Sequence, residues 1–376
     1  MTALRGSRIL MTTDAVGGVW TFSVTLARAL AKRGVQVSLV TLGPPPSEAQ
    51  LAELRGVSNL ELEITDCALE WMDPEGEDVE RTRGALGKIA ERTKPDLVHL
   101  NGYREALYPW LCPTLVVAHS CVRSWWLACR GEEPTEARWR TYVNSVEAGL
   151  AAADMWIAPT NTFRDCIQSL YTPPRQGRVI RNGIDTINQL EPKENFVLAA
   201  GRLWDEAKNI TTLIETADRV DWPIKLAGST SLSAAGFGRN VETLGDIPHG
   251  ELLDLMSRAS IFVAPAVYEP FGLSVLEAAT AGCALILSDI PTFRELWSGA
   301  AIFVEPRNAT KLADALQSLG RDAAQLAELQ RAASGRSTRY SAAAMLDGYC
   351  KAHKRLLGLT SSGLSYASRD LAEMCA

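Results

Sequence analysis

The sequence is poor in the residues and spacings that build metal or disulfide sites. It has four scattered histidines and eight cysteines, and no two cysteines form a C-x-x-C pair. This argues against a zinc knuckle or a thioredoxin-like redox pair. We expect free thiols in a reducing compartment, and we expect no bound metal.

Long apolar runs and excess positive charge are also missing. No stretch approaches the roughly 20 apolar residues that a membrane span requires, and the first residues lack the pattern of a signal peptide. Lysine and arginine number 38 against 44 acidic residues, which gives a net charge of −6 and no general attraction to nucleic acid. We therefore expect a cytoplasmic protein with no nucleic-acid partner and at most peripheral membrane contact.

The chain does contain an alternation of strand-like and helix-like segments that occurs twice, and its 376 residues suffice for two or three domains. The first series opens with a strand at 8–12, a helix at 21–32 and a strand at 35–40, a succession typical of a parallel sheet. The second begins with a strand at 196–200. Further strands are expected at 96–100, 114–118, 155–158, 224–227, 261–264, 284–288 and 301–304. Helices are expected at 160–171, 209–219, 272–281 and 309–357, the last with a break near Gly335.

A charged, irregular segment at 188–195 separates the two series and predicts the domain boundary. The expected fold class is α/β, with two Rossmann-like, doubly wound domains that face each other across a cleft. We assign them residues 1–188 and 189–340. Residues 341–376 are expected to form a helix that packs back toward the N-terminal domain, followed by a polar tail.

Two carboxylates, Glu269 and Glu277, are separated by seven residues around a predicted strand-to-helix turn. The helix N-terminus between them would attract an anion, and carboxylates beside it would accept hydrogen bonds from hydroxyl groups. This combination suits a nucleotide sugar. The alternative is a capping box from Ser274 to Glu277, in which Glu277 would only satisfy a backbone N–H at the helix start.

Two cations, Arg202 and Lys208, lie in the loop after the strand at 196–200. Cations at the mouth of a parallel sheet favour a phosphate group, whose oxygens match the guanidinium fork. The competing interpretation is a local ion-pair cluster with Asp205 and Glu206.

Together with the segment Arg181–Asp185 (RNGID), these motifs resemble the retaining glycosyltransferases of the GT-B fold, family 4 (glycosyl transferases group 1). The resemblance runs from residue 9 to about residue 357. Its elements are the Glu-x7-Glu spacing, the Arg and Lys of the loop, and the Asn-Gly-Ile-Asp segment, in that family's order along the chain. One departure is that five residues separate Arg202 from Lys208, where the family commonly has four.

The resemblance implies roles for individual residues. Glu277 would hold the donor ribose, Glu269 a hydroxyl of the donor sugar, and Arg202 and Lys208 the leaving diphosphate. His119 would face the reaction centre. The remaining donor contacts would come from Gly17 and Gly18 at the phosphates, Ile247 at the base, and the backbone at Phe271, Gly272 and Leu273, with Asp14 and Asn101 as weaker candidates.

The function implied is transfer of a sugar from a nucleoside diphosphate, with UDP favoured and GDP the alternative, to an acceptor hydroxyl with retained configuration. The N-terminal domain would bind the acceptor, which could be a glycan, a small molecule or a lipid-linked sugar, and the C-terminal domain would bind the donor. No metal or other cofactor is expected. A nucleotide-sugar 2-epimerase of the same fold and a non-catalytic binding relative are the alternatives.

The acceptor is left open by the sequence. Residues 120–142 contain Trp125, Trp126 and Trp139 and several arginines. These residues could bind either a sugar or an anionic acceptor. The alternative is that the tryptophans belong to the hydrophobic core and bind no acceptor.

Overall fold

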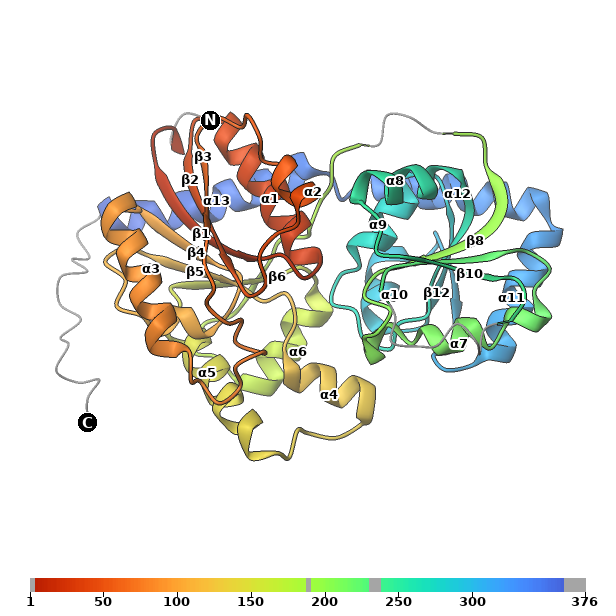
Figure 1. Ribbon diagram of the computed structural model, residues 1–376, viewed down its shortest axis with the longest axis horizontal. Coiled ribbons are helices and arrows are strands. Elements are labelled where there is room, and N and C mark those ends of the chain that lie inside the picture. Colours follow the sequence, from red (N-terminus) through yellow and green to blue (C-terminus); the bar gives the residue numbers. More distant parts are fainter. Residues whose placement is uncertain (1–3, 187–190, 230–237, 362–376) are drawn as a thin grey trace.

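The computed structural model describes residues 4–186, 191–229 and 238–361, which form two lobes, each built on one parallel β-sheet (Figure 1). The N-terminal sheet has the strand order β3-β2-β1-β4-β5-β6-β7. Its strands are β1 (Arg8–Asp14), β2 (Gln36–Leu42), β3 (Leu60–Ile64), β4 (Leu97–Leu100), β5 (Thr114–Val117), β6 (Met155–Ala158) and β7 (Arg178–Val179). Its helices are α1 (Gly18–Lys32), α2 (Glu48–Ala52), α3 (Val79–Thr93), α4 (Val122–Arg130), α5 (Ala137–Ala152) and α6 (Asn161–Tyr171).

The C-terminal sheet repeats this winding with the order β10-β9-β8-β11-β12-β13. Its strands are β8 (Glu194–Ala200), β9 (Ile224–Ala227), β10 (Val241–Gly245), β11 (Ala259–Ala264), β12 (Ala284–Ser288) and β13 (Ile302–Val304). The helices of this half are α7 (Ile210–Ile214), α8 (His249–Arg258), α9 (Leu273–Thr280), α10 (Pro291–Trp297), α11 (Ala309–Arg321), α12 (Ala323–Ser337) and α13 (Ala342–Ser361). The expected α/β class with two doubly wound sheets is therefore confirmed.

The point at which the strand order reverses decides where ligands bind in such sheets. In the N-terminal lobe it lies between β1 and β4, and in the C-terminal lobe between β8 and β11. Arg202 follows β8, Glu269 follows β11, and Asn101 follows β4. The sequence motifs thus stand at both reversal points.

The last helix, α13, packs on the N-terminal lobe although α12 packs on the C-terminal one (Figure 1). Met345, Tyr349 and Leu356 of α13 are buried in the same core cluster as α1. The chain therefore crosses from the C-terminal lobe back to the N-terminal lobe between α12 and α13. A backbone hydrogen bond holds this crossing, since the N–H of Ala342 donates to the carbonyl of Ile184 at 2.8 Å. A β-carbon on Gly183 would lie 2.2 Å from the Ser341 carbonyl oxygen, which explains the glycine of the RNGID segment.

Three strands that the sequence analysis did not predict are β3, β7 and β10. All three lie at sheet edges. An edge strand is covered on fewer sides than a central one, so its sequence lacks the continuous apolar run that identified the others. For example, β3 reads LELEI and alternates polar with apolar residues.

Two predicted helices were wrong in extent. The helix expected at 209–219 is only α7, because Thr216 Oγ donates to the Leu213 carbonyl at 2.7 Å and a short turn at 217–219 follows. The helix expected at 309–357 is three helices, and Gly335 lies inside α12. One break falls at Asp322, which caps α12 by accepting the Gln325 N–H at 2.9 Å, and the other falls at the crossing to α13.

The segment at 188–195 overlaps β8, which already begins at Glu194. Its residues 188–190 lie outside the described part of the chain, as does the polar tail from residue 362. The seven cysteines that the structure describes are free. In the described ranges, no helix combines the length and the apolarity that crossing a bilayer would take.

A pair of buried histidines joins α13 to β4. His353 Nε2 lies 3.3 Å from His99 Nδ1, and both side chains are fully buried. Such a pair needs one donor and one acceptor, so at least one of the two rings is neutral. Burial lowers the pKa of His353 to about 4 and, together with the neighbouring ring, lowers the pKa of His99 well below its usual value.

We therefore predict that acid weakens the docking of α13. In the unfolded chain each histidine takes up a proton near its ordinary pKa of about 6.5. The folded state does not, so the free energy of unfolding falls as pH drops below that value, by up to about 1.4 kcal/mol per pH unit for each ring. Urea titrations from about pH 7 to about pH 5 give the change of the unfolding free energy with pH. In His353→Gln this change should be smaller by the contribution of one ring, up to about 1.4 kcal/mol per pH unit.

A matched control for this titration is His249→Gln, because the pKa of His249 is raised in the folded protein. His249 stabilises the fold more as pH falls, so its removal should leave the slope steeper rather than shallower. An unchanged slope in His353→Gln would contradict a neutral, buried pair.

Candidate active site

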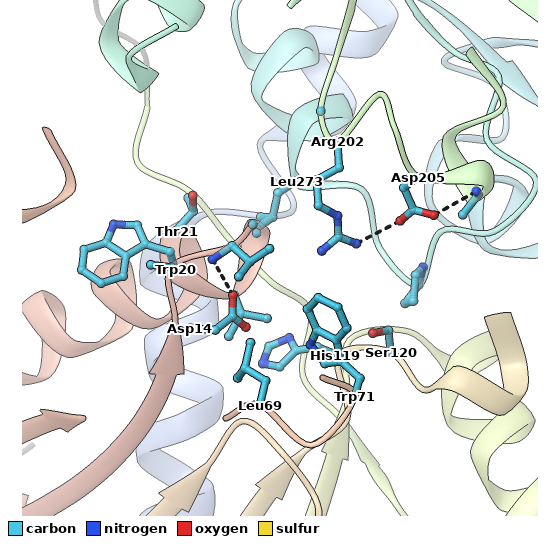
Figure 2. A pocket seen from close by; sticks show the side chains of 18 of the residues that line it. Asp14, Trp20, Thr21, Leu69, Trp71, His119, Ser120, Arg202, Asp205 and Leu273 are labelled. Carbon is cyan, nitrogen blue, oxygen red and sulfur yellow. Dashed lines mark hydrogen bonds and ion pairs between the residues drawn. The ribbon is translucent and has the colours of Figure 1, made fainter. Parts of the chain in front are cut away.

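The predicted site residues line one cavity of about 1100 Å³ between the two lobes. Figure 2 shows Asp14 and His119 of the N-terminal lobe across this cavity from Arg202 of the C-terminal lobe. The residues of the prediction that line it are Asp14, Gly17, Gly18, Asn101, His119, Arg202, Lys208, Ile247, Glu269, Phe271, Gly272, Leu273 and Glu277.

The two glycines before α1 let the lobes approach closely. A β-carbon on Gly17 would lie 3.2 Å from Arg202 Nη1, and one on Gly18 would lie 3.4 Å from Leu273 Cδ1. Gly17 is also the N-cap of α1 and offers no side-chain cap. The first N–H groups of α1 therefore lie beside a guanidinium group, and both favour an anion.

Asp14 supports this loop. Its Oδ1 accepts the N–H of Val16 at 2.9 Å. Burial raises the pKa of Asp14, while the hydrogen bond from Val16 and the charge of Arg202 act in the opposite direction. Asp14 thus shapes the turn that leads into Gly17.

Each of the two loop cations has one carboxylate partner. Arg202 Nη2 lies 3.2 Å from Asp205 Oδ2, and Lys208 Nζ lies 2.6 Å from Glu269 Oε2. The two pairs are part-buried, so the phosphate of a ligand would replace or extend ion pairs that already exist.

The extra residue in this loop is taken up by a short 3₁₀ turn at Glu206–Lys208. Asp205 caps the turn by accepting the Ala207 N–H at 3.0 Å. Lys208 therefore reaches the cavity despite the longer loop. The ion-pair cluster weighed in the sequence analysis forms only in part, because Glu206 pairs with Arg130 of α4 instead.

Glu277 does not form the capping box that the sequence also permitted. The N-cap of α9 is Gly272, whose φ of +87° suits glycine, and α9 has no side-chain cap. Glu277 lies in the second turn, and its Oε1 accepts a hydrogen bond from His249 Nε2 at 2.8 Å. It is 5 % exposed and lines the cavity, so its remaining lone pairs could accept a hydrogen bond from a ligand there.

His119 is held as a neutral ring. Asn101 donates its amide to the Thr12 carbonyl at 2.6 Å and to Ser23 Oγ at 3.1 Å, which turns its oxygen toward His119. His119 Nε2 donates to that oxygen at 2.8 Å. Burial lowers the pKa of His119 to about 3, so at neutral pH Nδ1 is left as an acceptor.

The three predicted site residues with apolar side chains lie on two sides of the C-terminal half of the cavity. Ile247 stands in the turn between β10 and α8, whereas Phe271 and Leu273 flank the N-cap of α9. Phe271 is buried in the C-terminal core, and Leu273 packs against the cores of both lobes.

Sequence reasoning missed one group of site residues and one contact between the lobes. His249 and Glu53 share the end of the cavity with Glu277, and the only available signal was that His249 directly follows the GDIP segment at 245–248. Helix α4 also contacts the cation loop, since Trp125 Nε1 donates to Asp205 Oδ1 at 2.9 Å. No local sequence pattern predicts a contact between residues that lie 80 positions apart in the chain.

Comparisons with known proteins agree with this geometry. The family model Glycos_transf_1 (glycosyl transferases group 1) matches residues 181–336, and Glyco_transf_4 (glycosyltransferase family 4) matches residues 16–187. A glycogen synthase of Mycobacterium tuberculosis is 32 % identical over 224 residues, which cover 52 % of this chain and 53 % of that protein. The alignment thus spans about half the length of that curated relative.

Solved structures support the fold over nearly the whole chain. Sucrose-phosphate synthase from Thermosynechococcus elongatus superposes with a TM-score of 0.76 at 18 % identity, over 94 % of this chain and all of the other. Anabaena HepE, solved in complex with UDP and glucose, superposes with a TM-score of 0.74 at 16 % identity, over 93 % and 100 %.

Two parallel, doubly wound sheets with a cavity at their facing reversal points define the GT-B class of protein. With both of its halves matched, the chain belongs to the family 4 glycosyltransferases.

We predict that the pKa of His249 depends on the carboxylate of Glu277. The hydrogen bond to the Glu277 carboxylate raises the pKa of His249, and the charges of Glu277 and Glu53 add to it. In Glu277→Gln the imidazolium loses that partner, so the pKa of His249 should fall. With four histidines in the chain, NMR titration of the imidazole resonances resolves this.

The matched control for this titration is Glu53→Gln, which should lower the same pKa by less because Glu53 contributes only its charge. Equal effects of the two variants would contradict the hydrogen bond as the main cause.

Proposed function

We propose that this chain transfers a sugar from a nucleoside diphosphate donor to an acceptor hydroxyl with retention of configuration. The observation that carries the proposal is the meeting of Arg202 and Lys208 with the uncapped start of α1 at one cavity. Cations beside free N–H groups favour a diphosphate and would stabilise the charge that develops as it leaves.

In this proposal the two glutamates bind hydroxyl groups. Glu277, next to the Ile247 turn, would hold the ribose, and Glu269 would hold a hydroxyl of the donor sugar beside the backbone of Phe271, Gly272 and Leu273. Glu269 already accepts a hydrogen bond from Lys208, and a carboxylate has further lone pairs with which to accept one from a hydroxyl group. A glycosidase-like pair of attacking carboxylates is not required.

His119 would contact the donor sugar as a neutral hydrogen-bonding group. Its low pKa makes it a poor proton acceptor. The departing phosphate would then take the proton of the acceptor hydroxyl as the acceptor attacks from the same face. Arg202 and Lys208 would supply the positive charge for this step, so no metal is invoked.

For the donor we favour UDP, with GDP as the alternative. The structural neighbour HepE was solved with UDP and glucose bound, which supports the choice of UDP. A nucleotide-sugar 2-epimerase or a non-catalytic binding relative would share the nucleotide contacts. These alternatives differ in the sugar product, which NMR of the reaction mixture identifies.

Thermal unfolding with UDP, GDP and ADP tests the donor site. A ligand at about 100 times its Kd should add roughly 2.7 kcal/mol, or several degrees. We predict that one nucleotide stabilises the wild type and that Glu277→Ala loses most of this shift. The control is Glu251→Ala, which removes an exposed carboxylate of α8 that does not line the cavity and should leave the shift intact.

Turnover tests the role of the cations. Arg202→Ala should lower kcat by roughly 10²- to 10³-fold, the usual loss for one group that stabilises a developing charge. Arg258→Ala removes an exposed arginine paired with Glu194 and should leave kcat unchanged. A loss confined to the donor KM in Arg202→Ala would assign Arg202 to binding alone.

A further inference from the structure

The N-terminal end of the cavity has an acidic floor formed by Glu70 and Glu105. Both line the cavity and are 9 % and 1 % exposed. Glu70 Oε2 accepts the N–H groups of Tyr103 at 3.1 Å and Arg104 at 2.9 Å. A carboxylate fixed in this way by the backbone is not free to leave the cavity wall.

The second carboxylate of this floor is incompletely satisfied. Within the described residues, Glu105 Oε1 has no hydrogen-bond partner, and the Arg104 guanidinium lies 3.8 Å away. That guanidinium is bound to Asp73 at 2.7 Å. A β-carbon on Gly102 would lie 2.8 Å from Glu105 Oε2, so the absence of a side chain leaves room at this carboxylate. The nearest donor to Oε1 is Arg104 Nε, which is itself buried and without a hydrogen-bond partner, so this carboxylate oxygen stays unsatisfied at the cavity wall.

The pKa values of the two carboxyl groups also depend on their burial in this floor. Burial, followed by the charge of Glu105, raises the pKa of Glu70 to about 8. Burial raises the pKa of Glu105 as well, so the floor favours a carboxyl that keeps its proton and can both donate and accept a hydrogen bond.

Three partly exposed tryptophans, Trp71, Trp126 and Trp139, line the same cavity as the floor. Trp139 also packs against the N-terminal core. Arg130 covers one face of Trp126, and Arg138 covers one face of Trp139. Trp71 is 38 % exposed, and Figure 2 shows it in the same part of the cavity as His119. We call these three residues the aromatic wall. Their apolar faces suit the C–H faces of a sugar ring, whose hydroxyls would turn to the floor.

The charges of the cavity disfavour an anionic acceptor. Its lining contains four lysines and arginines, each with a carboxylate within 4 Å: Arg130 with Glu206, Arg138 with Glu136, Arg202 with Asp205, and Lys208 with Glu269. A donor diphosphate would engage the last two. The other two are engaged as well, so a phosphate on the acceptor would have to share Arg130 and Arg138 with their carboxylates, and at the floor it would meet Glu70 and Glu105.

We propose that the floor and the aromatic wall form a subsite for a neutral, unphosphorylated sugar residue of the acceptor. This inference rests on the proposed function and specifies its acceptor class. It also answers the question that the tryptophans and arginines of residues 120–142 left open.

The test uses the full chain saturated with UDP and three kinds of probe. These are the methyl α-glycosides of glucose, mannose and galactose, the corresponding 6-phosphates, and glucosamine. Saturation-transfer NMR should show binding of at least one neutral glycoside, and its 6-phosphate should bind at least about tenfold more weakly. Tightest binding by a 6-phosphate or by glucosamine would overturn the neutral class.

Variants connect that binding to the subsite. Trp71→Ala should weaken the neutral glycoside roughly tenfold while UDP binding, measured by calorimetry, stays unchanged. The matched control is Met72→Ala, an exposed neighbour that does not line the cavity. Glu105→Gln tests the floor with little change in volume and should also weaken the glycoside. Unchanged glycoside binding in both Trp71→Ala and Glu105→Gln would overturn the inference.

Failure of the inference is distinguishable from failure of the proposed function. A protein that binds UDP but no neutral glycoside keeps its donor site and refutes the acceptor subsite. A protein that binds none of the three nucleotides refutes the nucleotide-sugar function, and the acceptor assignment falls with it.

Discussion

The return of α13 to the N-terminal lobe is the constraint on which the site depends. Tyr349 and Leu356 bury the helix against α1, and the backbone pairing of Ile184 with Tyr340 and Ala342 joins the two crossings of the chain. Two independent sheets would have no reason to face their reversal points toward each other. With both crossings fixed, Gly17 approaches Arg202 and Gly18 approaches Leu273 across the gap, and residues from both lobes come to line one cavity.

The close approach of the two lobes also determines which charged side chains face each other in the cavity. Arg202 and Lys208 would repel each other and lose solvation if they stood alone, and each is compensated by one carboxylate. A diphosphate entering between them would extend these pairs and would also reach the free N–H groups of α1. The N-terminal end carries the opposite balance, with Glu70 and Glu105 unmatched by a free cation among the described lining residues. The cavity is thus polarised: one part holds the two cations of the loop after β8 and the start of α1, and another holds the two buried glutamates.

The sequence predicted the features that are local. The central strands are continuous apolar runs, and Glu269, Glu277, Arg202 and Lys208 follow such runs at fixed spacing, so their placement at strand ends follows from chain order alone. It missed features that depend on residues far apart in the chain. The contact of Trp125 with Asp205, the pairing of His249 with Glu277 and the burial of Glu105 beside Glu70 all arise from tertiary packing. The capping-box alternative at Glu277 could be settled only by seeing where α9 begins.

Helix α4 links the two ends of this polarised cavity. Trp125 donates to one oxygen of Asp205, and the other oxygen of Asp205 accepts from Arg202. The same helix carries Trp126 of the aromatic wall, on whose ring Arg130 lies with its guanidinium 4.3 Å from the centroid, and Arg130 reaches Glu206. In the proposed acceptor subsite, a sugar residue packed against Trp126 would therefore contact the same helix that holds Asp205 beside Arg202.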